Sequence, residues 1–181
     1  TANSMNCLTE SIGMSLPGSG TIPAVYSARL RLAKMAGERV MDLLKDDIKP
    51  SDIITEKSIE NAMRCDMAIG CSTNTILHLT AIAHAAGHDI NLDDLNEMGN
   101  KTPQICKLNP ASSVFITDLN NVGGMQAVIK ELSTAGLIHT DCLTVSGTVA
   151  DRIAKAPDAD GEVIRKLDNP FSKDGGIAVL K

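Results

Sequence analysis

Glycine and proline residues divide the first two-thirds of this chain into segments that show the periodicity of α-helices. Apolar residues recur every three or four positions in residues 2–14 and again in residues 23–45. The turn Pro17-Gly18-Ser19-Gly20 separates these segments, and Pro23 suits the first position of the second helix. The pattern therefore predicts a fold in which helices pack through apolar stripes.

The segments that follow carry residues that cap helices. Thr55 can cap a helix that stops near Gly70. Ser72 or Thr73 can cap the next helix, and the nearly continuous apolar surface of that helix predicts that it is buried. Asn91, with an acidic residue three positions on, is typical of the start of a further short helix that ends near residue 98.

The pattern changes after Pro110. Short β-like runs occur at residues 114–117, 143–145, 163–165 and 177–180. Helical segments are predicted among them, at residues 124–135 and 148–156. Helices followed by mixed strands and helices indicate an α/β fold that is dominated by helix.

Length, charge and cysteine content exclude several classes of protein. A chain of 181 residues fits one domain. Its 17 basic and 22 acidic residues give a net charge of −5, which argues against nucleic acid as a partner because such a partner needs a basic face. No apolar stretch approaches the ~18 residues of a membrane span. The five cysteines are an odd number and widely spread, which predicts a reducing, cytoplasmic location. They form no Cys-x-x-Cys pair, which argues against a metal site.

The run Gly70-Cys71-Ser72-Thr73-Asn74-Thr75 is the strongest candidate for a binding site. Hydroxyl and amide side chains after a glycine, at the start of a helix, offer free N–H groups and the positive end of the helix dipole. Two interpretations stay open, because the same residue types are also ordinary helix caps. The residues alone therefore establish a helix-dominated lobe without an assigned reaction.

Long blocks of sequence, in order along the chain, resemble the dihydroxy-acid dehydratase family. They are TANSMNCLTE at residues 1–10, GMSLPGSGT at 13–21, DMAIGCSTNTILHL at 66–79, PQICK at 103–107, the run 118–124 and NPFSKDGGIAVL at 169–180. Sugar-acid and phosphogluconate dehydratases share the opening Thr-Ala-Asn-Ser but diverge soon after it. Residues 5–9 therefore favour the dihydroxy-acid enzymes, with the sister dehydratases as the alternative.

The resemblance implies a lyase of branched-chain amino-acid biosynthesis that removes water from a 2,3-dihydroxy-3-methyl carboxylic acid and yields a 2-keto acid. In this family an iron–sulfur cluster acts as a Lewis acid on the 3-hydroxyl group. A magnesium ion holds the carboxylate and the 2-hydroxyl group, and a serine alkoxide removes the C2 proton. The resemblance also implies a cytoplasmic homodimer with a small-molecule substrate.

The resemblance places no catalytic residue and no metal ligand within residues 1–181. The cluster cysteine and the magnesium carboxylates of the family precede Thr1, and the glutamate and serine base belong to a barrel-like domain after Lys181. Cys71 stands where the family has a second glycine, and Ser19 where it has asparagine. The candidate near-site residues are Thr1, Asn3, Ser4, Gly70, Ser72, Thr73 and Asn74.

The chain starts without methionine and ends in an apolar run, so we expect it to be part of a longer protein. Residues 1–181 are expected to form one lobe, the C-terminal half of the family's N-terminal α/β domain, with residues 163–181 leading into the barrel-like domain. We expect this lobe to bind no cluster and to be inactive alone. Alternatives from other classes are a small-molecule binding module and a structural or dimerisation lobe.

The helix of residues 2–14 is expected to position the cluster ligand that precedes it. Its expected inward side chains are Met5, Leu8, Ile12 and Leu16. Replacing Leu8 with alanine would then cost roughly 2–5 kcal/mol and loosen cluster retention.

Overall fold

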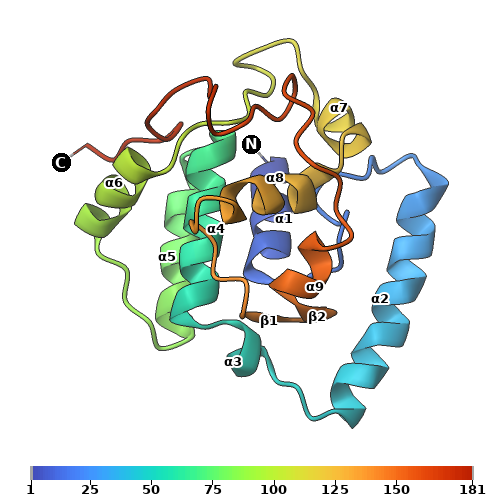
Figure 1. Cartoon of the computed structure of the whole chain (residues 1–181). Helices are drawn as coiled ribbons and strands as arrows, with labels where there is room; N and C mark the ends of the chain where they lie inside the picture. Colours follow the sequence, from blue (N-terminus) through green and yellow to red (C-terminus); the bar gives the residue numbers. More distant parts are fainter. Residues whose placement is uncertain (1, 181) are drawn as a thin grey trace.

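The computed structural model describes residues 2–180, and helices make up most of its regular structure (Figure 1). The elements are α1 (Ala2–Ile12), α2 (Ser27–Lys45), α3 (Pro50–Ile53), α4 (Glu56–Ile69), α5 (Asn74–Ala85), α6 (Leu92–Lys101), α7 (Ile116–Asn121), α8 (Gly124–Ser133), β1 (Leu143–Thr144), β2 (Gly147–Thr148) and α9 (Val149–Ile153). The prediction of a helix-dominated fold is confirmed.

Helices α1 and α4 pack against each other at the centre of the main core, with α5, α6 and α8 around them (Figure 1). Leu8 of α1 and Met67 of α4 are fully buried there. Burying side chains of this size contributes about 1.5–3 kcal/mol each. The predicted inward positions Leu8 and Ile12 are buried in α1 and Met5 is half-buried. Helix α1 ends at Ile12, two residues earlier than predicted, so Leu16 is buried beyond the helix, in a smaller core with Leu32.

Local signals explain the bounds of α4. The Thr55 hydroxyl group accepts a hydrogen bond from the Ser58 amide at 3.3 Å, and the Ser58 hydroxyl accepts one from the Thr55 amide at 2.8 Å. Gly70 ends the helix in the left-handed conformation, with φ of 63°. Both predicted ends of this helix are therefore confirmed.

Helix α2 lies at one side of the molecule (Figure 1) and starts at Ser27, four residues later than predicted. Residues 23–26 form a turn instead, because the Arg29 guanidinium group donates to the carbonyl groups of Ser19 and Ile22 and holds the chain there. The predicted stripe faces the core only in part. Among the residues of α2, all of which are described, only Leu32 is buried.

The prediction that α5 is buried all round is wrong. Only Thr75, Leu79 and Ala83 of this fully described helix are buried. They form one face, because they are spaced by four residues and lie against α4 and α1. The opposite face, which includes Leu77, is exposed.

Three of the four predicted strands are absent from the described residues. Residues 143–144 pair with 147–148 in the one antiparallel sheet, but residues 116–121 form α7, started by the Asp118 carboxylate, which accepts from the Phe115 amide at 2.7 Å. The Asp160 carboxylate accepts from two amides in the 163–165 run, and Asn96 holds both backbone groups of Val179. These side chains replace the ladder partners that a strand would need.

The remaining helix predictions differ from the structure in their lengths. The predicted helix of residues 124–135 is confirmed as α8, which ends at Ser133. Helix α6 runs three residues past its predicted end, to Lys101, and its Asn91 cap accepts from the Asp93 amide at 3.0 Å. Helix α9 ends at Ile153, earlier than predicted.

Candidate functional site

A cavity of about 380 Å³ lies where α1 and α5 begin and α4 ends. The loop between α6 and α7 closes its other side. Its lining residues are Asn3, Ser4, Cys7, Ile69, Gly70, Cys71, Ser72, Leu108, Asn109, Pro110, Ala111 and Ile116. The cavity therefore combines a polar wall, at two helix N-termini, with a largely apolar wall.

Three side chains provide the hydrogen-bonding groups of the polar wall. The Ser4 hydroxyl group accepts from the Ser72 amide at 3.3 Å and so joins the first turn of α1 to the entrance of α5. Asn3 donates to the Gly20 carbonyl group at 2.7 Å. The hydroxyl oxygen of Ser72 is buried and has no hydrogen-bond partner among the described residues. A buried polar atom without a partner is uncommon and suits a site that receives a polar ligand.

The backbone at Gly70 requires glycine. A Cβ atom there would lie 2.5 Å from the side-chain nitrogen of Gln104, and the φ of 63° is one that other residues rarely adopt. Gly176 packs equally closely, because a Cβ on it would lie 2.5 Å from the Gly70 Cα. Cys71 is accommodated, since its φ lies outside the left-handed region. The cysteine at this position therefore fits the turn.

A buried carboxyl group, that of Asp66, stabilises the first turn of α5. Asp66 is 0% exposed, and its two oxygens accept from the Thr75 hydroxyl group at 2.9 and 2.8 Å. Burial raises the pKa of Asp66 to about 6, although the Thr75 hydroxyl group opposes this shift. The Asp66–Thr75 pair thus connects the last turns of α4 to the first turn of α5.

The thiol groups do not fit a metal or cluster site. Burial raises the pKa of Cys7 to about 12 and that of Cys71 well above its usual value, so neither thiol is ionised at neutral pH. Within residues 2–180, no group of three or more cysteine, histidine or acidic side chains converges as metal ligands. The described residues therefore offer neither a thiolate set for an iron–sulfur cluster nor a carboxylate set for magnesium.

The structure brings together four of the seven predicted near-site residues, since Asn3, Ser4, Gly70 and Ser72 line the cavity. Thr73 and Asn74 are exposed and do not line it. Thr1 lies outside the described residues. Thr73, and not Ser72, stands at the N-cap of α5, and its side chain makes no capping hydrogen bond to the described residues. Of the two cap positions that the sequence left open, the structure therefore has Thr73, and the Ser72 alternative is wrong.

Sequence reasoning missed the apolar wall and the buried support. Leu108, Pro110 and Ala111 belong to a loop between α6 and α7, and no local pattern assigns a loop to a cavity. Asp66 stands in a helix whose periodicity could have shown that it faces inward, four residues after the buried Ala62. An inward carboxyl group is the signal that could have found it.

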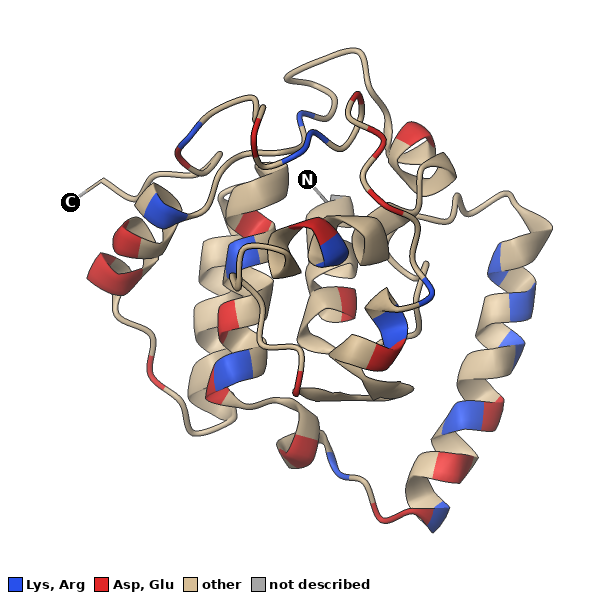
Figure 2. Ribbon diagram, in the orientation of Figure 1, with Lys and Arg blue, Asp and Glu red and all other residues tan. Residues whose placement is uncertain are grey.

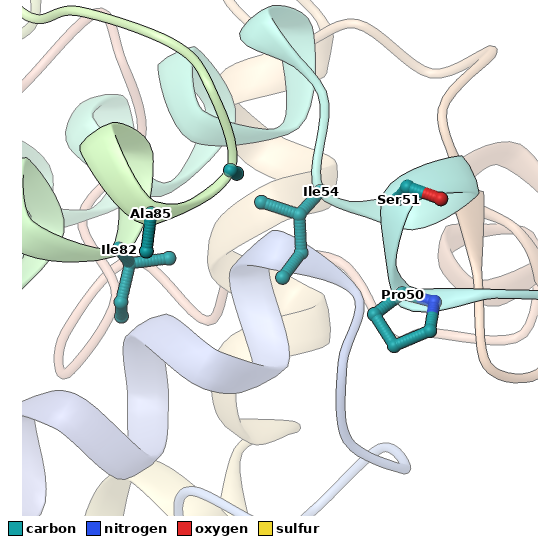
Figure 3. A pocket seen from close by; sticks show the side chains of 6 residues that line it. Pro50, Ser51, Ile54, Ile82 and Ala85 are labelled. Atoms are coloured by element: carbon teal, nitrogen blue, oxygen red, sulfur yellow. The ribbon is translucent and has the colours of Figure 1, made fainter.

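A second hollow of similar volume lies between α3 and α5 (Figure 3). Ile54 and Ile82 point into it from opposite sides, and its other apolar lining residues are Pro50, Ala85 and Ala86. Ser51 is the one hydroxyl group among its described lining residues. This hollow lacks converging polar groups, so the cavity at the start of α1 and α5 remains the candidate site.

The sequence of this lobe matches that of a known class of enzymes. Residues 1–152 match the family model described as the N-terminal region of dihydroxy-acid/6-phosphogluconate dehydratases. The chain belongs to this family, and the resemblance inferred from its sequence blocks is confirmed.

Curated relatives make the likeness more specific. A dihydroxy-acid dehydratase of Acetivibrio thermocellus is 57% identical over 182 residues, which cover 100% of this chain and 33% of the relative. One from Desulfosudis oleivorans is 59% identical over 182 residues, with 99% of this chain and 33% of the relative covered. The chain thus spans about a third of the length of these curated relatives. Within the described residues, no helix is both long and apolar enough to cross a membrane.

Proposed function

We propose that the complete protein that contains this chain is a hydro-lyase of branched-chain amino-acid biosynthesis. It removes water from a 2,3-dihydroxy-3-methyl carboxylic acid and yields the 2-keto acid. The observation that carries this proposal is the cavity, in which a few polar donors face the apolar side chains of Ile69, Leu108 and Ile116. Such a lining suits a short branched acid, and the relatives named dihydroxy-acid dehydratase support the same substrate class.

The sister activity, on 6-phosphogluconate, is less well supported by the cavity. A phosphate group is usually held by arginine or lysine side chains or by a glycine-rich loop. None of the described residues that line the cavity is charged. The cavity wall therefore favours a dihydroxy acid with an alkyl group over a phosphorylated sugar acid.

We propose that this chain binds and orients the substrate but carries out no bond-breaking step. Dehydration removes the C2 proton and the C3 hydroxyl group as water, and the resulting enol takes a proton at C3 to become the ketone. The first step needs a base at C2 and an acid at the departing hydroxyl group. The described lining residues contain hydroxyl, amide and protonated thiol groups, none of which is activated as a base.

The cofactors expected for the family, an iron–sulfur cluster and magnesium, are proposed to be held by parts of the protein outside residues 1–181. The described residues do not fit either group. We also propose that the complete protein is a cytoplasmic homodimer, that residues 1–181 act as one lobe, and that residues 163–181 lead into the next domain.

A comparison of residues 1–181 with the complete protein tests whether this chain binds and orients the substrate without carrying out the reaction. We expect the complete protein, with its cofactors, to form 2-keto acid from 2,3-dihydroxyisovalerate, and residues 1–181 alone to form none. The product is measured as its hydrazone. Turnover by residues 1–181 would contradict the proposal, and tight binding of the acid by this lobe alone, measured by calorimetry, would favour an independent binding module.

The cavity itself is tested by Ser72→Ala in the complete protein. Loss of one hydrogen bond of about 1 kcal/mol should raise the KM about fivefold. Stability should be unchanged or slightly higher, because the Ser72 oxygen has no partner among the described residues. Thr73→Ala is the matched control, since its side chain is exposed and outside the cavity. Equal KM values for both variants and the wild type would show that Ser72 does not contact substrate.

A further inference from the structure

Glu10 is a buried carboxyl group that does not line the cavity. It is the one charged residue of α1 (Figure 2) and is 1% exposed. Burying a carboxyl group is costly unless hydrogen bonds replace the water that it loses. An apolar side chain could fill this position without that cost, so we expect Glu10 to make contacts that packing alone does not provide.

The hydrogen bonds of Glu10 hold the loop that follows α1. One carboxyl oxygen, Oε2, accepts from the Gly20 amide at 2.9 Å, and the other, Oε1, accepts from the Gly18 amide at 3.1 Å. The Gln126 side chain of α8 also donates to Oε1, at 2.7 Å. Burial raises the pKa of Glu10, and these hydrogen bonds and the Arg152 charge oppose that shift. The carboxyl group therefore fixes the loop backbone at Gly20.

Gly20 connects this carboxyl group to the first turn of α1. A Cβ atom on Gly20 would lie 2.7 Å from the Cys7 Cα, so the loop backbone lies directly on the helix. The Gly20 carbonyl group accepts from the Asn3 side-chain nitrogen at 2.7 Å and from the Cys7 thiol at 3.5 Å. Glu10 thus binds the amide of Gly20, and Asn3 binds its carbonyl group.

The bond to Gly20 also decides which end of the Asn3 amide can reach a ligand. Both hydrogens of Asn3 Nδ2 are used, by the Gly20 carbonyl group and by the Cys7 sulfur at 3.7 Å. Asn3 Oδ1 accepts from the Asn6 side chain at 3.3 Å, and its second lone pair has no partner among the described residues. Asn3 lines the cavity, whereas Gly20 does not. The Asn3 atom available to a ligand is therefore the acceptor Oδ1.

We propose that Glu10 is a positioning residue, which holds Asn3 through Gly20 so that Asn3 Oδ1 accepts a hydrogen bond from one hydroxyl group of the substrate. The two hydroxyl groups are the donors of a 2,3-dihydroxy-3-methyl carboxylate, because its ionised carboxyl group only accepts. This inference rests on the proposed function, since it assigns a contact to the substrate class proposed above.

Asn3→Ala in the complete protein tests the contact with the hydroxyl group. The KM for 2,3-dihydroxyisovalerate should rise about fivefold, because one hydrogen bond is lost. The probes of direction are 2-hydroxyisovalerate and 3-hydroxyisovalerate, which each keep one of the two hydroxyl groups and are studied by calorimetry. The variant should raise the Kd of one probe about fivefold and leave that of the other unchanged. An unchanged KM, or equal effects on both probes, would overturn the contact.

Glu10→Gln tests the positioning role. It should reproduce the selective loss of Asn3→Ala, because an amide has one oxygen and cannot accept from both loop amides. The double variant should lose no more than Asn3→Ala alone, since both changes act on one contact. The matched control is Glu131→Gln, because the half-buried Glu131 carboxylate accepts from the Leu167 amide at 2.9 Å, and it should leave both Kd values unchanged. Additive losses in the double variant would overturn the positioning role.

Gly20→Ala provides a second variant if Glu10→Gln does not fold. Its Cβ atom would move the loop carbonyl group away from Asn3 while leaving the Glu10 carboxyl group in place. The same selective loss is expected, and unchanged Kd values would overturn the role of the loop. Turnover by the wild type separates the two proposals. A complete protein that does not dehydrate 2,3-dihydroxyisovalerate would contradict the proposed reaction, whereas turnover that is indifferent to Asn3→Ala would contradict only this inference.

Discussion

Helices α4 and α2 look alike in sequence but differ in their surroundings. Both show apolar residues at helical spacing, yet α4 buries ten of its fourteen residues and α2 buries only Leu32 among its described residues. The cause is position: α4 lies between α1, α5 and α6, whereas α2 meets the rest of the chain along one narrow face. Periodicity therefore predicts a helix and a stripe to be covered, but not what covers it.

The largest expected effect compares how much buried packing in α1 and exposed packing in α2 contribute to the free energy of unfolding. Leu8→Ala, in the helix packed on α4, should lower the free energy of unfolding by roughly 2–5 kcal/mol, because it leaves a cavity in a fully buried site. Leu44→Ala, at an exposed site on α2, should change it by less than about 0.5 kcal/mol. Urea unfolding at protein concentrations too low for self-association measures both. Equal losses would mean that α2 is covered within the same chain.

The iron–sulfur cluster proposed for the complete protein extends the Leu8 test. If α1 positions the ligand that precedes it, Leu8→Ala should also lower the iron content, measured against wild type. Undiminished iron in a destabilised Leu8→Ala protein would remove the positioning role proposed for α1 while leaving its packing role.

A smaller effect, on the order of 2–3 kcal/mol, is expected from the buried carboxyl group of α4. Because the folded-state pKa of Asp66 is raised to about 6 from 3.8, the folded protein binds its proton more tightly than the unfolded chain does. Asp66 therefore favours folding fully at low pH, and this contribution is lost as pH rises from about 4 to 6.

The measurement is the unfolding free energy of wild type and Asp66→Asn across this pH range. The variant carries no titrating group at this site. Its free energy of unfolding minus that of wild type should therefore increase between pH 4 and 6 and then stay constant. Taking the difference removes the contributions of other groups, such as Glu10, whose pKa burial also raises. A difference that does not vary with pH would show that Asp66 does not titrate in this range.

The smallest expected effects concern helix caps. Thr55→Ala should destabilise the protein by about 1 kcal/mol, because it removes the acceptor for the Ser58 amide at the start of α4. At the start of α2, Tyr26 makes no side-chain capping bond to the described residues, so Tyr26→Ser should stabilise by up to about 1 kcal/mol. Thermal unfolding measures both, and a stabilising Thr55→Ala would contradict the role assigned to this cap.

The elements that could be predicted are those with local causes. Thr55 and Gly70 bound α4 through hydrogen bonds and a backbone conformation that involve only neighbouring residues. The run 114–117 was mispredicted as a strand because β-branched residues outweighed Asp118, whose carboxylate starts a helix there. The burial of α5 was mispredicted because an apolar surface is necessary for burial but does not create a neighbour on every side.

In the candidate site, too, residues with a local sequence pattern could be predicted and residues from distant segments could not. Gly70 and Ser72 were recognisable because a glycine and hydroxyl groups at a helix start are a local pattern. Their neighbours in the cavity, such as Asn3 and Leu108, come from segments far away in sequence. A sequence pattern within one segment cannot show that residues of distant segments lie close together.

The amino-acid sequence by itself determined the helical segments, their main breaks, the family and the polar run at the start of α5, because these depend on local geometry or on identity along the chain. Only the tertiary structure decided which stripes are covered, that Ser72 is a buried hydroxyl group rather than a cap, and that α2 exposes a second apolar face. Those properties arise from contacts between distant segments, whose free energies depend on how each surface meets another.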